Sequence, residues 1–142
     1  MRTKRPELDG LARDVVCDAL GTDTGLVIDV VDRIAAPFPL ALIAWIVGVP
    51  REDWMLLFRL SNEVIGKDDP EFRRPGESPG QTIKRARGEI RGYFEGLLAA
   101  RRRDPQDDLV SDLLGATVDG EPLTEEQLLS FCELFVEAGN ET

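Results

Sequence analysis

The sequence predicts a mainly α-helical fold with at most a short strand or hairpin. Apolar side chains recur at helical spacing along several segments, and residue types that begin or end helices flank those segments. The composition agrees with this prediction, because 42% of the 142 residues are hydrophobic, as suits a globular core. A chain of this length fits one ordinary domain, so residues 1–142 are interpreted as a single helical domain.

The amino-terminal part of the chain is expected to hold one long helix followed by short local structure. The helix covers about residues 4–20, with Pro6 in its first turn and Gly21 after its end. A short apolar run at 26–28 fits an isolated strand. Residues 29–35 fit one or two further helical turns.

Three helices and one loop are expected in the middle of the chain. A nearly all-apolar helix is predicted over 40–47, closed by Gly48, and another follows over about 50–65. Residues 66–80 hold three prolines and three glycines and are predicted to form a mobile loop. A long amphipathic helix is then expected over about 81–103. Its buried stripe consists of apolar residues at helical spacing: Ile83, Ala86, Ile90, Tyr93, Phe94 and Leu97.

A short helix, a turn and a longer helix are predicted toward the carboxyl end. Residues 107–114 fit a short amphipathic helix, and Asp119-Gly120 is typical of a turn. Thr124 and Gln127 form a capping-box pattern, so the last helix is expected to begin at about Glu125. This helix carries apolar side chains around most of its circumference, which is typical of a buried central helix.

The end of this last helix indicates that it continues beyond Thr142. The sequence offers no glycine cap and no basic last turn there. Glu141 adds negative charge where the helix dipole is already negative. We therefore expect the chain to be an incomplete domain, a fragment of a larger protein.

The charge balance and the apolar pattern exclude several classes of function. Acidic residues number 27 and basic residues 17, and the resulting net charge of −10 argues against nucleic-acid binding. Pro37 and Pro39 interrupt the longest apolar stretch, at 35–50, which is too short for a membrane span. No basic-then-apolar signal segment opens the chain, so a cytoplasmic location without membrane association is expected.

The residue types also restrict the possible chemistry. The sequence has no histidine, which removes Ser-His-Asp and Cys-His nucleophiles and every metal site that needs histidine, so no metal ligand is predicted. The two cysteines, Cys17 and Cys132, stand far apart in apolar helical segments. We interpret both as buried thiols rather than as a disulfide or a metal-binding pair.

One group of residues near the carboxyl end could carry chemistry. Gly139 lies within the apolar helix, where glycine costs ~1 kcal/mol relative to alanine and small residues leave a groove. Glu141 and Thr142 add an acid and a hydroxyl beside that groove, and such a pair could pass protons to a molecule bound there. A frayed polar helix end is the alternative interpretation of these residues.

The carboxyl end of the chain resembles the oxygen-activating helix of the cytochrome P450 family. The motif is Ala-Gly-Asn-Glu-Thr at 138–142, closing the helix opened by Leu-Thr-Glu-Glu-Gln. Residues 107–114, Asp-Asp-Leu-Val-Ser-Asp-Leu-Leu, are similar to the helix that precedes it in bacterial members. Residues 39–53 are similar to their Pro-Leu…Ile…Leu-Gly-Val-Pro-x-Glu-Asp segment. The resemblance runs along essentially the whole chain and covers about the middle third of a family member.

The resemblance implies a fragment of a haem-dependent monooxygenase, which inserts one oxygen atom of O2 into an organic substrate. Ala138 and Gly139 would form the groove over the haem face where dioxygen binds. Thr142 would hydrogen-bond the bound oxygen, and Glu141 would help deliver protons for cleavage of the O–O bond. Leu134 would line the substrate cavity.

The resemblance also implies substrates and partners. The cavity face around Leu134 and Ala138 is apolar, which favours an apolar substrate, and similarity at 54–72 to bacterial members indicates a steroid, terpenoid or lipid. The helices around Leu56 and Ile90, with the loop at 66–80, would form a mobile roof over it. The family's other partners are O2 and a ferredoxin or flavoprotein electron donor.

Two parts of the family pattern are missing from the sequence. They are the proximal cysteine loop, which supplies the thiolate ligand of haem, and the Glu-x-x-Arg helix that should follow the oxygen-activating helix. We expect the isolated chain to be inactive, because iron without a thiolate ligand lacks the electron donation that favours O–O cleavage. The alternative to the family interpretation is a small all-helical interaction protein with no catalytic activity.

Overall fold

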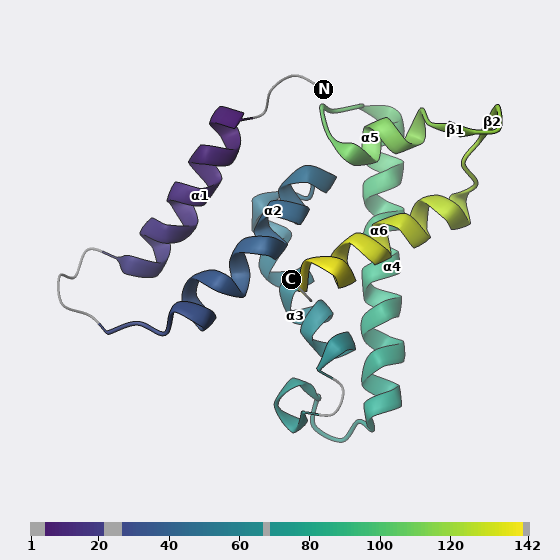
Figure 1. Ribbon diagram of the computed structural model, residues 1–142. Helices are drawn as coiled ribbons and strands as arrows, with labels where there is room; N and C mark the ends of the chain where they lie inside the picture. Colours follow the sequence, from purple (N-terminus) through teal and green to yellow (C-terminus); the bar gives the residue numbers. More distant parts are fainter. Residues whose placement is uncertain (1–4, 22–26, 67–68, 141–142) are drawn as a thin grey trace.

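The computed structural model describes residues 5–21, 27–66 and 69–140, and these residues are mainly helical, as predicted (Figure 1). The helices are α1 (Arg5–Leu20), α2 (Pro37–Val47), α3 (Trp54–Ile65), α4 (Pro79–Arg103), α5 (Leu109–Leu114) and α6 (Glu125–Asn140). Shorter elements are the π-helical turn η1 (Val31–Ala35) and the 3-10 turns η2 (Arg51–Asp53) and η3 (Pro70–Phe72). Strands β1 (Thr117–Val118) and β2 (Glu121–Pro122) pair as a short hairpin.

The predicted turn at Asp119-Gly120 is the hairpin turn between β1 and β2. Its two residues have positive φ angles of 54° and 85°, which a type I′ turn requires at both central positions. Val118 pairs with Glu121 in antiparallel register directly across the turn. The turn is therefore confirmed, and it reverses the chain between α5 and α6.

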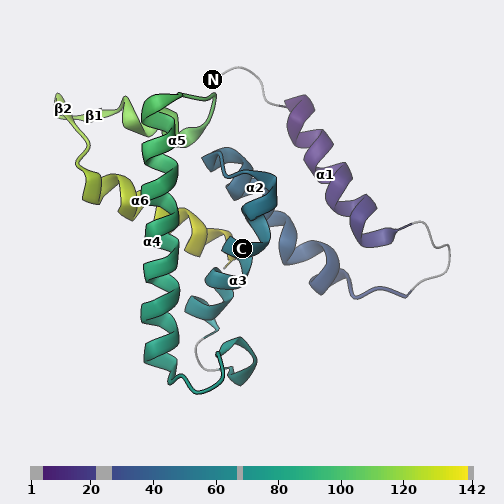
Figure 2. The ribbon, with the colours of Figure 1, turned by 180° about the vertical axis from the view of Figure 1, so that it is seen from behind.

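α4 is the longest of the described helices, and the central helices pack against it. α3 and α6 both contact it, α6 crosses it and also contacts α2 and α3, and α1 lies at the edge beside α2 and η1 (Figures 1 and 2). The core forms where these apolar faces meet. Its most deeply buried members are Ala44, Val47, Leu57, Leu60, Ala86, Ile90, Phe94, Leu98, Val110, Leu129, Cys132 and Val136. Among the described residues, no helix is both long enough and apolar enough to cross a membrane.

Two helices begin earlier than predicted, and proline is the reason in both. Pro37 and Pro39 stand in the first turn of α2, where the N–H that proline lacks has no helical partner in any case. Pro79 likewise opens α4, after a capping box that the prediction missed. In that box, the backbone N–H of Ser78 donates to Gln81 Oε1 at 2.8 Å, and Gln81 N–H donates to Ser78 Oγ at 3.4 Å.

The predicted loop at 66–80 contains ordered local structure within its described residues. The carboxylate of Asp69 accepts a 2.9 Å hydrogen bond from the backbone N–H of Glu71 and so caps η3. Phe72 packs against Gly66, where an added Cβ would lie 2.3 Å from Phe72 Cδ2. The segment is therefore shorter than predicted, and its mobility stays a prediction.

α1 packs on the rest of the chain with one face only. Leu11 and Ala19 are buried on the face toward α2 and η1, whereas Cys17 lies on the opposite face and is exposed. The prediction of a buried thiol is thus wrong for Cys17, because nothing among the described residues covers that face. It is confirmed for Cys132. The strand expected at 26–28 does not form at its two described positions, and Leu26 lies outside the described residues.

Candidate functional site

The candidate site lies on α6, whose start is fixed by the predicted capping box. Thr124 N–H donates to Gln127 Oε1 at 2.9 Å, and Gln127 N–H donates to Thr124 Oγ1 at 3.3 Å. Arg102 of α4 binds the first-turn carboxylate of Glu125, and this hydrogen bond lowers the pKa of Glu125. These contacts hold the beginning of α6 against α4.

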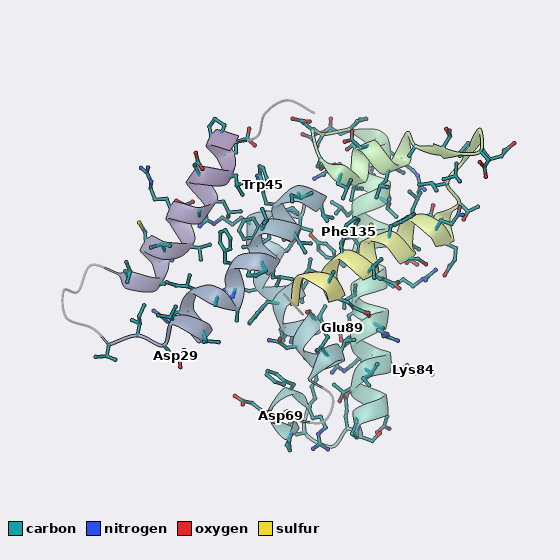
Figure 3. All side chains as sticks on the ribbon, viewed as in Figure 1. Asp29, Trp45, Asp69, Lys84, Glu89 and Phe135 are labelled. Atoms are coloured by element: carbon teal, nitrogen blue, oxygen red, sulfur yellow. The ribbon has the colours of Figure 1, made fainter. Side chains whose placement is uncertain are left out.

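α6 has one buried face and one exposed face among the described residues, so only part of the predicted central helix is covered in this chain. Leu129, Cys132 and Val136 belong to the core that α6 shares with α2, α3 and α4. Phe135, labelled in Figure 3, packs against the same core. On the opposite side, Leu134 is 60% exposed. The helix would need further elements over that side to become central.

The exposed apolar side chains of α6 form a single stripe. Phe131 is 41% exposed, and Leu134 and Ala138 are exposed as well. Their spacing of three and then four residues places them one above the other on the same helical face. The structure therefore brings together two predicted site residues, Leu134 and Ala138. We call these three residues the α6 stripe.

The remaining predicted site residues are described only in part. Gly139 lies in the last turn of α6. Glu141 and Thr142 lie outside the described residues. Their predicted roles stay predictions.

A charged residue on α6 has a structural explanation that the sequence did not reveal. Glu137 interrupts the apolar pattern of this helix, and its carboxylate pairs with Arg87 of α4 at 3.2 Å. Arg91 of α4 lies 3.6 Å from the carboxylate of Glu133 and also hydrogen-bonds Glu126. These ion pairs hold α6 against α4 along the length of α6, on a side of the helix other than that of the α6 stripe.

Comparisons with known proteins identify the family. The steroid C26-monooxygenase of Mycobacterium tuberculosis is 33% identical over 136 residues, which are 96% of this chain and 29% of that protein. The crystal structure of CYP109E1 from Bacillus megaterium in complex with testosterone superimposes on 100% of this chain and 36% of that chain, with a TM-score of 0.80 and 28% identity. Cytochrome P450 109 of Bacillus spizizenii is 36% identical over 115 residues, which are 81% of this chain and 28% of that protein. The chain belongs to the cytochrome P450 family.

This P450 chain spans 27–29% of the length of the steroid C26-monooxygenases that it matches. No protein-family model matches it. The family predicted from the motifs is confirmed, and the matched share of the relatives is close to the predicted third.

Haem is the cofactor that P450 membership implies, and the α6 stripe fits one face of it. The stripe is apolar, and Ala138, toward the carboxyl end of α6, carries a small exposed side chain. A flat apolar ring can lie against such a surface without burying polar groups that lack hydrogen-bond partners. The described residues are therefore compatible with the distal wall of a haem site.

The described cysteines do not fit the thiolate that a P450 places on the iron. Cys132 is fully buried in the core, and burial raises the pKa of its thiol to about 11. Cys17 lies on α1, on the far side of α2 from α6 (Figures 1 and 2). Among the described residues, no three His, Cys, Asp or Glu side chains gather where they could hold a metal ion.

Thiol alkylation should separate the two cysteines. In the native chain at neutral pH, Cys17 is expected to react with iodoacetamide about tenfold or more faster than Cys132, because only Cys17 is exposed and burial keeps Cys132 protonated. Mass spectrometry of the tryptic peptides over time measures both rates. In denaturant the two should react alike. Equal rates in the native chain would contradict the packing of Cys132 beneath α6.

Proposed function

We propose that this chain is the middle part of a haem-dependent monooxygenase that inserts one oxygen atom of O2 into an apolar organic substrate. The observation that carries the proposal is the α6 stripe, an exposed apolar face on the helix in which the sequence motif Ala-Gly-Asn-Glu-Thr begins. Haem, when bound in the whole protein, supplies the iron that activates dioxygen. Ala138 and Gly139 would border the haem, and Leu134 would contact the substrate.

The resemblance to P450s implies that Thr142 and Glu141 handle protons, and their spacing along the sequence supports this proposal. Thr142 stands four positions after Ala138, and Glu141 stands seven after Leu134. In a helix continued through residue 142, both would fall on or beside the face of the α6 stripe. The hydroxyl of Thr142 would then hold a proton next to the reacting dioxygen, and the carboxyl group of Glu141 would resupply it.

The substrate proposed is an apolar molecule, of the steroid, terpenoid or lipid class. The α6 stripe has no charged member, and the Mycobacterium tuberculosis relative is a steroid C26-monooxygenase. A ferredoxin or a flavoprotein would supply the electrons. The isolated chain would be inactive, because neither described cysteine fits the thiolate that would hold the haem iron.

The alternative function is a helical interaction protein without catalytic activity. The same α6 stripe favours it, because an exposed row of Phe131, Leu134 and Ala138 also suits a protein partner. Membership of the P450 family favours the monooxygenase. Catalytic variants of the whole protein distinguish the two.

Replacing Thr142 by alanine in the whole protein is expected to divert electrons from product to hydrogen peroxide several-fold. The variant loses the hydroxyl that would hold a proton beside the reacting dioxygen. The measurement is the amount of product and of peroxide formed per NAD(P)H consumed. Thr142→Ser keeps the hydroxyl and should retain coupling. Unchanged coupling in Thr142→Ala would remove Thr142 from the mechanism.

The 142-residue chain itself should not form a thiolate-ligated haem complex. Haem can adsorb to the α6 stripe, but Cys132 is buried in the core and Cys17 lies on another side of the molecule. The measurement is the carbon-monoxide difference spectrum of the reduced, haem-loaded chain. A thiolate-type Soret band that disappears in Cys17→Ser or Cys132→Ala would contradict the assignment of this chain to the distal side.

A further inference from the structure

One ion pair lies where the side of α6 that faces α4 meets the α6 stripe. It joins the carboxylate of Glu137 to the guanidinium of Arg87 on α4, with 3.2 Å between Oε1 and Nη2. Glu137 stands three positions after Leu134 and directly before Ala138, and residues three or four apart are neighbours on a helix surface. The pair therefore borders the surface that the proposed function gives to the substrate.

This ion pair contributes little to the stability of the fold. The side chains of Glu137 and Arg87 are 34% and 58% exposed, and solvent screens a pair that is exposed to this extent. Arg91 already holds α6 against α4 nearer its beginning, by binding Glu126. A charged group beside an apolar binding surface loses hydration when a ligand covers it, unless the ligand brings a hydrogen-bonding group of its own. The position of the pair thus points to a polar group on the ligand.

The hydrogen-bonding groups of the pair are only partly used. Among the described residues, Glu137 binds Arg87 through Oε1 alone, and Arg87 binds Glu137 through Nη2 alone. Oε2 of Glu137 can still accept a hydrogen bond, and the other N–H groups of the guanidinium can still donate. An acceptor and a donor therefore lie next to each other at the edge of the α6 stripe.

The charges of the pair favour a neutral group on the ligand. One carboxylate and one guanidinium cancel, so neither an ammonium nor a carboxylate group gains a net attraction there. A hydroxyl group is neutral and can both donate and accept a hydrogen bond. It can donate to Glu137 and accept from Arg87 at the same time, whereas an ether or a ketone can only accept.

We propose that the substrate of the whole protein is an apolar alcohol, whose hydroxyl group is held by Glu137 and Arg87 while its hydrocarbon part lies on the α6 stripe. This inference rests on the monooxygenase function proposed above and adds the polar group that orients the substrate. Hydrogen bonds to charged groups are stronger than those between neutral groups, so the pair would fix one end of the molecule. Glu137 and Arg87 are thus specificity-determining residues, with a role separate from proton delivery.

The test compares three alcohols with their methyl ethers, which keep the acceptor oxygen and lose the donor. The alcohols are decanol, geraniol and testosterone, and isothermal titration calorimetry of the whole, haem-loaded protein measures each dissociation constant. At least one alcohol is expected to bind about tenfold more tightly than its ether, because the ether leaves the carboxylate of Glu137 without a donor. Binding of no alcohol, or equal binding of every alcohol and its ether, would overturn the proposal.

Variants of the pair show whether Glu137 causes the preference. In Glu137→Leu the ratio of the ether and alcohol dissociation constants should fall to about twofold or less, whereas Glu137→Gln keeps an acceptor oxygen and should retain most of the ratio. Glu126→Gln is the matched control, since Glu126 also binds α4 but stands about three helical turns before Glu137. An unchanged ratio in Glu137→Leu, or an equal fall in Glu126→Gln, would refute the role of Glu137.

Charged probes test the neutrality of the pair. Decylamine and decanoate have the same chain as decanol with an ammonium or a carboxylate at its end, and both should bind more weakly than decanol. Tighter binding of either ion would show that the pair selects a charge, and the proposal would be wrong.

Calorimetry also separates this inference from the proposed function, because it measures binding whether or not the protein oxidises the probe. A preference for alcohols that depends on Glu137, without any oxidised product, would refute the monooxygenase and leave the binding site. Oxidised product together with a ratio that does not depend on Glu137 would refute the inference and leave the monooxygenase.

Discussion

Replacing Gly48 by alanine is expected to destabilise the chain by about 3–5 kcal/mol. Gly48 ends α2 with a φ of +97°, a conformation that strains any residue with a side chain. A Cβ at this position would lie 2.1 Å from Oδ2 and 2.5 Å from Cβ of Asp108. The alanine methyl therefore cannot be accommodated by a small rotation of the carboxylate.

The displacement of Asp108 makes this effect large. Asp108 is buried, forms an ion pair with Arg101 of α4, and caps α5 by accepting a 2.8 Å hydrogen bond from Ser111 N–H. Arg101 also donates to the carbonyl oxygen of Gly48 at 2.7 Å. One added methyl group would thus disturb the junction of α2, α4 and α5 together. Breaking a buried ion pair costs about 3–5 kcal/mol when one charge is left unpaired.

Urea denaturation followed by circular dichroism measures the change. Gly115→Ala is the matched control, because Gly115 has an ordinary negative φ and its added Cβ would meet no atom closer than 3.7 Å. This control should change the free energy of unfolding by less than about 1 kcal/mol. If Gly48→Ala unfolded at the same urea concentration as Gly115→Ala, the contact between Gly48 and Asp108 would be refuted.

Replacing Arg85 by glutamine is expected to destabilise the chain by about 3 kcal/mol or more. The Arg85 guanidinium binds three carboxylates, those of Glu63 at 2.7 Å, Glu77 at 2.8 Å and Glu89 at 3.0 Å. The side chain of Glu63 is only 6% exposed, so the variant leaves a buried carboxylate with Arg74, 3.6 Å away, as its remaining cation. Glu77, in the segment before α4, would keep only its hydrogen bond from Thr82.

Acidification should reduce the difference in the free energy of unfolding between Arg85→Gln and the wild type. The hydrogen bond from Arg85 lowers the pKa of Glu77, so the stability that this pairing contributes is present above the ordinary carboxyl pKa. It is lost as the pH falls through the lowered value. The variant lacks this contribution, so its stability depends less on pH in that range. Unfolding curves recorded across the acidic range measure how the free energy of unfolding depends on pH in the variant and in the wild type.

Arg102→Gln is the control for this second variant. Arg102 pairs with Glu125, but both side chains are about half exposed, at 45% and 50%. Solvent screening limits such a pair to about 0–1 kcal/mol. An equal loss of unfolding free energy in Arg85→Gln and Arg102→Gln would contradict the importance of burial at Glu63.

Much of the fold could be predicted because its signals are local. A capping box joins residues three apart, so Thr124 and Gln127 located the start of α6 before any packing was known. The Asp-Gly pair between β1 and β2 likewise predicts positive φ from two neighbouring residues. Where prediction failed locally, as at Pro37 and Pro79, one residue type was compatible with both a loop and a helix start.

The candidate site was only partly predictable, because its exposure depends on contacts between segments that are far apart in the sequence. The motif at 138–142 named its residues, and helical spacing placed Leu134 and Ala138 on one face. No pattern along the chain predicted that this face is exposed while Cys132 and Val136 are buried. That difference depends on which side of α6 meets α2, α3 and α4.

The sequence by itself determined the helices, the hairpin turn and the family, since each follows from residues a few positions apart or from a motif. Only the tertiary structure decided which side chains are buried and which charges pair. Arg101 reaches Gly48 across 53 positions of sequence, and Arg87 reaches Glu137 across 50. Partners so far apart meet only because packed helices bring them together, and the free energy of each contact depends on the burial that packing creates.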